Sequence, residues 1–275
     1  MNLALLGAGG TMGSRIAANL ARTDRYDVAH VEPDPDGRDR LRERGVEPID
    51  RADALAGADI VVLAVPDRII GDLCGEIAGD LVDGTIVLTL DPAAALAGDL
   101  PDREGLVHVV SHPCHPTLFG NRSPEHAEDW FGGQGAAEQP VTCALHAGPE
   151  GRYAEGEAVV RDVWAPVSRV HRVSVEEMAL LEVALAENLL ATFLLAVREG
   201  LEELVARGLD RGAAEDFLLG HARAQLAMFF GPLDHGLSEA AERAVEQGRE
   251  QALAEDWAAV LGTDRLRENV REILA

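Results

Sequence analysis

The stretch LALLGAGGTMG, residues 3–13, decides the fold of this chain. Four apolar residues lead into a turn in which Gly7, Gly10 and Gly13 follow a G-x-x-G-x-x-G spacing; the stricter G-x-G-x-x-G spacing fails because Met12 occupies its third glycine position. Glycines at these intervals allow a tight turn, let a pyrophosphate approach bare backbone and bring the next helix close to the strand. A glycine turn in another α/β fold is the alternative, but this turn opens a strand–helix–strand unit, which favours a dinucleotide site.

Residues around the turn indicate which dinucleotide it would bind. The helix that begins at Thr11 and Met12 offers unsatisfied N–H groups and a positive dipole end to a phosphate. Glu32 ends the second strand, 19 residues after the last glycine of the turn. A carboxylate there accepts hydrogen bonds from the ribose hydroxyls and repels a 2′-phosphate, so we expect NAD rather than NADP. Asp67 and Asp91 follow two later strands; each is a candidate site residue or a helix cap, and the cap is favoured for Asp91.

Short β-rich runs alternate with helical stretches over the first part of the chain. The runs predicted as strands are Leu3–Leu6, Asp27–Val31, Ile60–Val65, Thr85–Leu90, Val107–Val110 and Val141–Leu145, with an alternating run at 167–173. Apolar strands separated by helices indicate a parallel sheet covered on both faces. From Ser174 the pattern is helical, and Ser174 with Glu177 forms a capping box that starts a helix reaching about Arg207. We therefore predict an α/β fold: a Rossmann, doubly wound, mostly parallel sheet over 1–173 that binds NAD, then an all-helical domain over 174–275 for substrate binding and dimerisation.

The composition is strongly acidic and lacks lysine. The chain has 48 Asp and Glu against 24 basic residues, all of them Arg, and a net charge of −24. Nucleic-acid binding needs a positive surface, so nucleic acid is not expected as a partner. Acid spread along the whole chain resembles proteins of salt-loaded, halophilic cytoplasms, with a GC-rich genome favouring Arg as the alternative. Three cysteines without framework spacing indicate reduced thiols in a cytoplasmic protein.

A long apolar run at 178–197 approaches the length that spans a membrane. Glu182, Glu187 and Asn188 in its middle would make a lipid-facing helix costly, so we expect a buried helix and no membrane partner. A helix this apolar is also too hydrophobic to stand in water, which predicts a homodimer.

Two imidazoles and a thiol are crowded into SHPCHP, residues 111–116, directly behind an apolar strand. Its two prolines stiffen the segment, and its place after a strand puts it at the carboxyl edge of the sheet near the nicotinamide. Three interpretations stay open: His115 and a helix carboxylate bind a divalent metal, His112 or His115 is the general base of hydride transfer, or both histidines are structural. Cys114 is expected to pack inward as a small hydrophobe. The irregular segment 117–140 that follows is expected to be a functional loop.

Several motifs together carry a family resemblance. GAGGTMG, DIVVLAVPDRIIGD, TLDPAAALAG, HVVSHPCHPTLFG and EEMALLEVALAENLLA resemble the D-apionate oxidoisomerase family of phosphogluconate-dehydrogenase-like proteins, over residues 2 to about 200. The resemblance implies NAD-dependent oxidation of a branched sugar acid, coupled to an acyl shift within the same molecule that gives 3-oxoisoapionate. Such a shift resembles ketol-acid rearrangement and would benefit from a Lewis acid. The chain departs from the family's helix pattern at Val183, where a proline is usual.

The long helix is expected to supply partners for the histidines. In β-hydroxyacid dehydrogenases the equivalent helix carries a Lys and, four residues on, an Asn; Asn188 could match this Asn, but Ala184 stands at the Lys position. A carboxylate in so apolar a helix is costly unless it faces a site. Glu182 matches the family's LLE signature, so we predict it as the metal ligand with His115. On an α-helix Glu187 would point about 140° away from Glu182, so we expect Glu187 to pair with an Arg at a subunit interface instead.

These features predict an NAD-dependent enzyme that acts on a small hydroxylated sugar acid, with a divalent metal ion as a further cofactor. The predicted catalytic residues are His112, His115, Glu182 and Asn188. A simple β-hydroxyacid or phosphogluconate-type dehydrogenase without rearrangement is one alternative. A non-catalytic NAD-binding regulator is another, suggested by the missing lysine and by Val183.

Overall fold

The structure of this chain is a computed structural model that describes residues 1–119, 129–132, 137–231 and 233–275. The chain forms two compact units. The first comprises Met1–Thr117, Arg122–Leu180 and Arg267–Ala275, and the second comprises Leu118–Asn121 and Leu181–Leu266. Most of the loop expected at 117–140 falls on 120–128 and 133–136, which lie outside the described residues.

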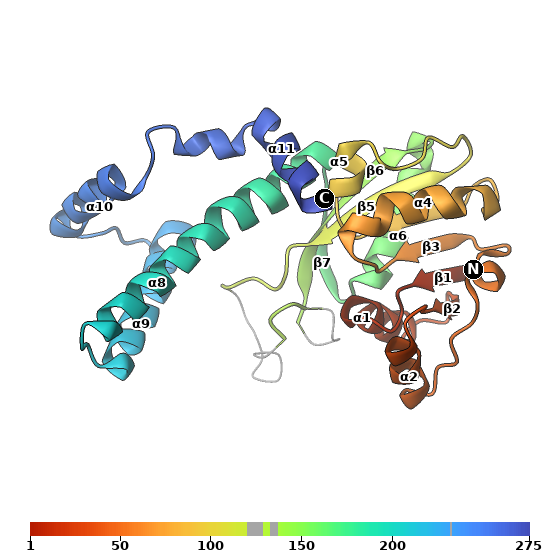
Figure 1. Cartoon of the computed structure of the whole chain (residues 1–275), viewed down its shortest axis with the longest axis horizontal. Coiled ribbons are helices and arrows are strands. Elements are labelled where there is room, and N and C mark those ends of the chain that lie inside the picture. Colours follow the sequence, from red (N-terminus) through yellow and green to blue (C-terminus); the bar gives the residue numbers. More distant parts are fainter. Residues whose placement is uncertain (120–128, 133–136, 232) are drawn as a thin grey trace. The chain divides into compact units, whose positions relative to one another are not determined.

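The first unit is built on one seven-stranded sheet with the order β2-β1-β3-β4-β5-β6-β7 (Figure 1). Every neighbouring pair is parallel except β5 and β6. The strands are β1 (Asn2–Leu6), β2 (Asp27–Val31), β3 (Ile60–Leu63), β4 (Ile86–Thr89), β5 (Val107–Pro113), β6 (Gln139–Ala147) and β7 (Val167–Arg172). The predicted doubly wound, mostly parallel fold is confirmed, and each predicted run overlaps a strand.

Helices cover both faces of this sheet. One face is covered by α1 (Thr11–Leu20), α2 (Pro35–Glu43) and α6 (Tyr153–Val163), and the other by α3 (Arg51–Leu55), α4 (Ile70–Ile77) and α5 (Ala93–Ala97). Because side chains alternate along a strand, Leu3 and Leu5 of β1 join one core while Ala4 and Leu6 join the other. The parallel strands β1, β3, β4 and β5 all end at the same edge. The glycine turn, Asp91 and the start of SHPCHP therefore lie at that edge.

A single helix runs from Val175 to Ala206, through α7 (Val175–Ala179), the segment η5 (Leu180–Ala191) and α8 (Thr192–Ala206). The predicted capping box is present: the Glu177 N–H donates to Ser174 Oγ at 3.1 Å, and the Ser174 N–H donates to Glu177 Oε2 at 2.7 Å. The segment η5 is a 12-residue π-helix, in which hydrogen bonds join residues five apart. The α-helical geometry expected for this stretch is wrong. Residues five apart on η5 are therefore closer in angle than the same residues would be on an α-helix.

The second unit is helical and leaves much apolar surface uncovered. It contains α8, α9 (Arg211–Phe230), α10 (Glu239–Ala252) and a 3-10 turn, η6 (Trp257–Leu261), before α11 (Thr263–Leu274). Leu194, Phe217 and Phe230 are 59%, 69% and 80% exposed. By length and composition the helix Val175–Ala206 could span a membrane, and only 11% of its most apolar window is buried. The expectation of a buried helix is therefore wrong for the single chain, because the helices that follow cover too little of it.

Candidate active site

The glycine turn makes the close contacts that its spacing predicts. Gly7 has a φ of +79°, and a Cβ there would lie 2.3 Å from the carbonyl oxygen of Ala64. A Cβ at Gly13 would lie 2.1 Å from the carbonyl oxygen of Gly7, so only glycine lets α1 start this close to the turn. Gly9, which the spacing did not single out, is equally constrained: its Cβ would lie 2.5 Å from the Gly37 carbonyl oxygen. That contact arises from the first turn of α2, which a local sequence motif does not contain.

The first turn of α1 is open to an anion. Gly10 is the N-cap and has no side chain to occupy the free N–H groups, and Thr11 and Met12 are the first two helical residues. Unsatisfied N–H groups at a helix start, reached over bare glycine backbone, fit the pyrophosphate of a dinucleotide.

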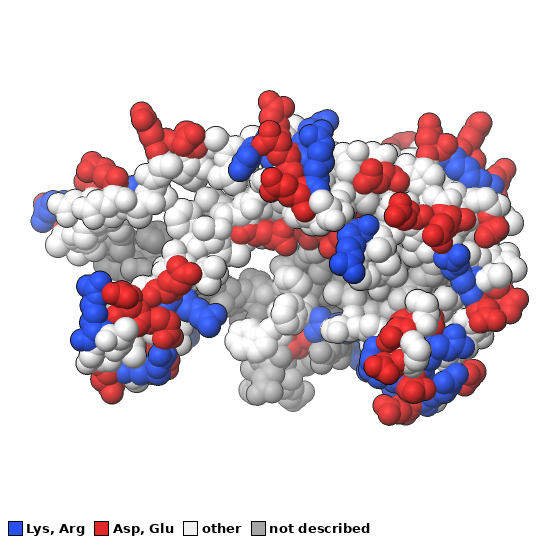
Figure 2. Space-filling model, in the orientation of Figure 1, with Lys and Arg blue, Asp and Glu red and all other residues white. Residues whose placement is uncertain are grey.

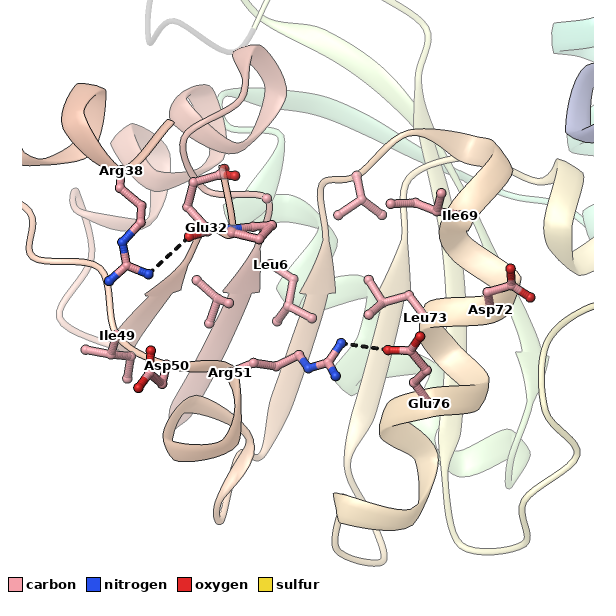
Figure 3. A pocket seen from close by; sticks show the side chains of 14 residues that line it. Leu6, Glu32, Arg38, Ile49, Asp50, Arg51, Ile69, Asp72, Leu73 and Glu76 are labelled. Atoms are coloured by element: carbon pink, nitrogen blue, oxygen red, sulfur yellow. Dashed lines mark hydrogen bonds and ion pairs between the residues drawn. The ribbon is translucent and has the colours of Figure 1, made fainter. Parts of the chain in front are cut away.

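A cavity of about 540 Å³ adjoins this turn (Figure 3). Gly7, Leu6, Val31 and Val65 give it a largely apolar wall. Charged side chains also line it: Glu32, Arg38, Asp50, Arg51, Asp72 and Glu76. An apolar cavity beside a pyrophosphate turn fits the adenosine half of a dinucleotide. Four carboxylates against two guanidinium groups would disfavour an additional phosphate. Asp67 begins the short turn η1 (Asp67–Ile69) and is not one of the residues that line this cavity.

Glu32 lies where a contact with the ribose was expected, but both of its carboxylate oxygens already accept hydrogen bonds from backbone N–H groups. Its Oε2 accepts the Gly9 N–H at 2.8 Å and its Oε1 accepts the Asp34 N–H at 3.0 Å, and the residue is 7% exposed. Carboxylate oxygens accept more than one hydrogen bond each, so these contacts leave capacity for ribose hydroxyls. Glu32 therefore fixes the glycine turn as well as lining the cavity.

His112 is a strand residue with a fixed tautomer. It lies in β5, where its backbone oxygen accepts the Thr142 hydroxyl at 3.0 Å. Its Nδ1 lies 3.0 Å from the carbonyl oxygen of Leu90. A carbonyl can only accept, so Nδ1 carries the proton and the lone pair is on Nε2. Burial lowers the pKa of His112, and the Leu90 hydrogen bond and the Asp91 charge oppose this less strongly. The imidazole is thus neutral near neutral pH, with Nε2 able to take a proton or a cation.

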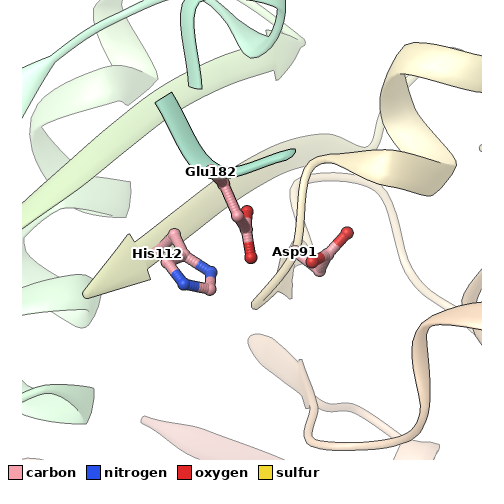
Figure 4. A group of neighbouring side chains, drawn as sticks. All are labelled: Asp91, His112 and Glu182. Atoms are coloured by element: carbon pink, nitrogen blue, oxygen red, sulfur yellow. The ribbon is translucent and has the colours of Figure 1, made fainter. Parts of the chain in front are cut away.

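Asp91 begins the connection to α5, and its carboxylate lies near both the start of that helix and the side chains of His112 and Glu182. Its Oδ1 accepts the N–H of Ala93, the first residue of α5, at 2.7 Å, although Pro92 and not Asp91 occupies the N-cap position. Ligand atoms of Asp91, His112 and Glu182 also lie within 4.8 Å of one another (Figure 4). Two carboxylates and one imidazole nitrogen form a donor set that suits a divalent cation. The sequence singled out His112 and Glu182 but favoured Asp91 only as a cap, because the approach of β4 and β5 that brings it to His112 is tertiary.

His115 lies outside this group. Its φ is +61°, a left-handed conformation that is uncommon for a residue other than glycine. Its Nδ1 lies 3.0 Å from the Phe131 carbonyl oxygen, and its ring meets the Phe131 ring edge-on at 5.5 Å between centroids. The ring is 6.4 Å from that of His112, so the two histidines face one region. Cys114 is exposed and not packed inward as expected, because Pro113 before it takes the buried position of β5.

Asn188 lies on η5 with its amide nitrogen buried. Its Nδ2 has no hydrogen-bond partner among the described residues. A buried amide donor without a partner costs about 1–3 kcal/mol, which indicates that a ligand or water accepts this hydrogen bond in the working protein.

Comparison with known proteins matches both parts of the chain. Residues 2–92 match the family model "NADP oxidoreductase coenzyme F420-dependent", and residues 120–274 match "Phosphogluconate dehydrogenase (decarboxylating) C-term". The chain is 45% identical to a D-apionate oxidoisomerase of Cupriavidus necator, with 98% of each chain covered. It is 42% identical to a D-apionate oxidoisomerase of Rhizobium rhizogenes, again with 98% of each covered.

Comparison with solved structures agrees with these sequence matches. A semialdehyde dehydrogenase NAD-binding protein of Cupriavidus necator, crystallised with calcium and NAD, superposes with a TM-score of 0.95 at 45% identity and 98% coverage of both chains. An NADH-preferring ketol-acid reductoisomerase from an uncultured archaeon has a TM-score of 0.70 at 15% identity, covering 99% of this chain and 81% of that one, and shows the fold alone. With such identities over almost the whole length, and with a cofactor turn that fits NAD, this chain is an NAD-dependent oxidoreductase and belongs to the D-apionate oxidoisomerase family.

Proposed function

We propose that this enzyme oxidises D-apionate, or a closely similar branched sugar acid, with NAD and rearranges the product in the same site. The observation that carries the proposal is the group of Asp91, His112 and Glu182. Asp91 and His112 lie at the strand edge that also bears the cofactor turn. Relatives with this substrate in their name match almost the full chain. NAD would supply the hydride acceptor, and a divalent cation would supply a Lewis acid for the oxygens of the substrate.

The two carboxylates are assigned to the cation. Hard divalent cations such as Ca²⁺ and Mg²⁺ prefer oxygen ligands, and Ca²⁺ is present in the related Cupriavidus necator structure. Asp91 and Glu182 would therefore hold the cation, with Nε2 of His112 beside it. His115, the ligand expected from sequence, is not in the group of ligand atoms and is assigned to substrate contact instead.

His112 is assigned to proton transfer. Its Nε2 lone pair would accept the hydroxyl proton while the hydride leaves the same carbon, so that the carbinol becomes a carbonyl. The following shift is redox-neutral. One group breaks its bond to the neighbouring hydroxylated carbon and migrates with the bonding electrons to the new carbonyl carbon, whose oxygen gains a proton and becomes a hydroxyl. The carbon that the group leaves becomes the carbonyl as its hydroxyl loses a proton. The same imidazole can return and accept these protons. Asn188 would donate its amide N–H to a substrate oxygen.

Cofactor binding is assigned to Gly7, Gly10 and Gly13 with the first turn of α1, formed by Thr11 and Met12. Glu32 would accept the ribose hydroxyls. Asp67, predicted from its place after β3, is retained only as a residue near the strand edge, since it does not line the cavity.

The deciding experiment is turnover of D-apionate with NAD in concentrated KCl, with and without a chelator, followed by NMR of the product. Formation of NADH together with a rearranged product that requires a divalent cation supports the proposal. NADH formation with an unrearranged oxo acid would instead identify a simple dehydrogenase. Binding of NAD without turnover of any sugar acid would favour a regulator.

The assembly is assigned as a cytoplasmic homodimer. Leu194, Phe217 and Phe230 are exposed in the single chain, and a second copy of the same helices is the simplest apolar cover for them. Glu182 and Glu187 within the apolar helix disfavour lipid as that cover. Light scattering after size exclusion tests this: a monomer that sediments with lipid vesicles would contradict it.

Acidic side chains are spread over the face seen in Figure 2, in keeping with an enzyme of a salt-rich cytoplasm that does not bind nucleic acid. We assign 1–173 to NAD binding and 174–275 to substrate binding and dimerisation. Activity and thermal stability that both rise with KCl concentration would support the halophilic assignment, and a maximum at low salt would contradict it.

A further inference from the structure

The short segment 129–132 contacts both the cofactor helix α1 and His115. The Nδ1 of His115 lies 3.0 Å from the carbonyl oxygen of Phe131, and the two rings meet edge-on at 5.5 Å between centroids. The guanidinium carbon of Arg15 lies 5.4 Å from the centroid of the same Phe131 ring. Arg15 belongs to α1 and follows Thr11, the first residue of that helix, by about one turn. Phe131 is therefore shared by the helix assigned to the pyrophosphate and by a residue assigned to the substrate.

Asp129 gives Arg15 a second contact with this segment. Its residue is 8% exposed, and its Oδ1 lies 3.9 Å from Arg15 Nη2. Its Oδ2 accepts the Ala137 N–H at 3.4 Å, and its backbone oxygen accepts the Gly132 N–H at 3.3 Å. A carboxylate this buried is costly without donors and a compensating charge, and Arg15 supplies positive charge. Arg15 thus contacts the segment both through a charge and through a ring.

The conformation of His115 makes support from this segment necessary. Its φ of +61° is unfavourable for a residue other than glycine, and such a conformation persists only where surrounding contacts hold it. Phe131 holds the His115 ring by the two contacts described above. Phe131 is itself 60% exposed, so much of its ring is not packed and the contact with Arg15 helps to hold it.

The Phe131 carbonyl also selects the tautomer of His115. A carbonyl can only accept, so Nδ1 carries a proton and, in the neutral ring, Nε2 has the lone pair. The His115 ring centroid lies 6.4 Å from that of His112, so one substrate can meet both rings. A small displacement of His115 would weaken its contact with a substrate held at His112.

We infer that Arg15 is a positioning residue of the active site: through Asp129 and Phe131 it holds His115 in the conformation that contacts the substrate. The inference rests on the proposed contact between His115 and the sugar acid. It gives the cofactor helix a second role, in binding the substrate.

The test compares Arg15→Met with Arg25→Met in the full-length protein, with NAD and D-apionate in KCl. Methionine keeps an unbranched apolar side chain and removes the guanidinium. We expect Arg15→Met to raise the KM for D-apionate by a factor of about 3 to 10, with kcat changed less and NAD affinity unchanged. Arg25 is the matched control, because its guanidinium also contacts a ring, that of Tyr26 at 5.5 Å, and a carboxylate, that of Asp162 at 2.6 Å. It lies before the start of β2, at the opposite edge of the sheet, so Arg25→Met should keep the original KM.

Further variants show whether the effect passes through Phe131 and His115. Phe131→Leu removes the ring and should raise the KM as Arg15→Met does. Arg15→Lys keeps the charge and can lie over the ring, so it should recover part of the loss. Adding Arg15→Met to His115→Gln should raise the KM no further, because the residue that is positioned has gone. A full further rise in that background would overturn the inference, as would an Arg15→Met variant that loses NAD affinity and thermal stability at an unchanged KM.

Nitrogen-15 NMR of the imidazoles gives a measurement that needs no turnover. In the NAD-bound protein without substrate, the His115 ring should be one tautomer with its proton on Nδ1, and His115→Gln identifies its signals. Arg15→Met should shift these signals toward those of mixed tautomers, and Arg25→Met should leave them in place.

The two measurements separate the inference from the proposed function. If D-apionate is turned over but Arg15→Met matches Arg25→Met in KM and in the His115 signals, the inference is overturned and the proposed function stands. If no sugar acid is oxidised while Arg15→Met still mixes the tautomers, the proposed function fails and the positioning of His115 by Arg15 stands. If neither turnover nor a change in the His115 signals is seen, both are overturned.

Discussion

Replacing Gly13 by alanine tests whether the glycine turn positions α1 for the cofactor. The new Cβ would lie 2.1 Å from the Gly7 carbonyl oxygen and 2.7 Å from the Cα of Ala8. Both are backbone atoms that cannot rotate away. Ordinary contacts begin near 3.4 Å, so α1 has to withdraw from the turn by about 1 Å. Overpacking of this kind costs about 1–3 kcal/mol of folding free energy.

The effect on NAD should exceed the effect on stability. A withdrawal of about 1 Å lengthens the hydrogen bonds between the first turn of α1 and the pyrophosphate, and each bond to a charged group contributes about 1.5–3 kcal/mol. Losing one such bond weakens NAD binding by a factor of about 10 to 100. We expect calorimetry to show this loss for Gly13→Ala, together with a melting temperature lower by several degrees.

Gly75→Ala is the matched control for the same chemical change. Gly75 lies in α4, has no heavy atom within 4 Å of its Cβ position and has no positive φ. Alanine there should leave NAD affinity unchanged and raise stability by about 0.5–1 kcal/mol through helix propensity. If Gly13→Ala binds NAD as tightly as the unmodified protein and melts at the same temperature, the assigned role of the turn is refuted.

Three further outcomes follow from single side chains. In Glu32→Gln the amide oxygen can replace only one of the two carboxylate acceptors, because the amide nitrogen cannot accept the N–H of Gly9 or Asp34. Calorimetry should show a stability loss of about 1–3 kcal/mol and weaker NAD binding. His108 is 2% exposed, and burial lowers its pKa from 6.5 to about 4, so the unfolded chain binds a proton between these values that the folded chain does not. Stability should therefore be complete above pH 6.5 and fall by up to about 3 kcal/mol as the pH approaches 4, and urea unfolding of His108→Leu should lack that part of the loss. Phe230→Asp places a charge at a side chain that is 80% exposed in the single chain, and light scattering should show a monomer if a second copy covers it.

Local patterns predicted most of the first unit, and their success has a physical basis. Runs such as Ile60–Val65 and Val107–Val110 are β-branched and apolar on both faces, as strands covered on both sides must be. The pair Ser174 and Glu177 predicted the residue at which the long helix starts, because a capping box is a local pair of hydrogen bonds. These features depend on neighbours within a few positions, which a sequence displays directly.

The features that were missed depend on contacts between distant segments. Gly9 is constrained by Gly37, and the Asp91 carboxylate reaches His112 only because β4 and β5 end side by side. The π-register of η5 has no residue signature: Leu, Ala and Glu fit an α-helix equally well, so the 140° separation of Glu182 and Glu187 followed from an assumed period. Hydropathy showed that the long helix is apolar, but the expectation that it is buried was wrong for the single chain, because its cover depends on segments distant in the sequence.

The two histidines of SHPCHP differ because the strand does not end where the apolar run ends. β5 continues through Ser111, His112 and Pro113, and the antiparallel β6 pairs with all three. The backbone of His112 is therefore fixed by strand pairing, and its ring is fixed by the contact with the Leu90 carbonyl. These two contacts fix the direction in which Nε2 points. His115, two residues past the strand, has a left-handed backbone and is held through a loop carbonyl, that of Phe131. Sites built on strands keep their geometry more closely than sites built on loops, and proton transfer tolerates little displacement. This difference in support, and not residue type, is why we propose His112 for proton transfer and His115 for substrate contact.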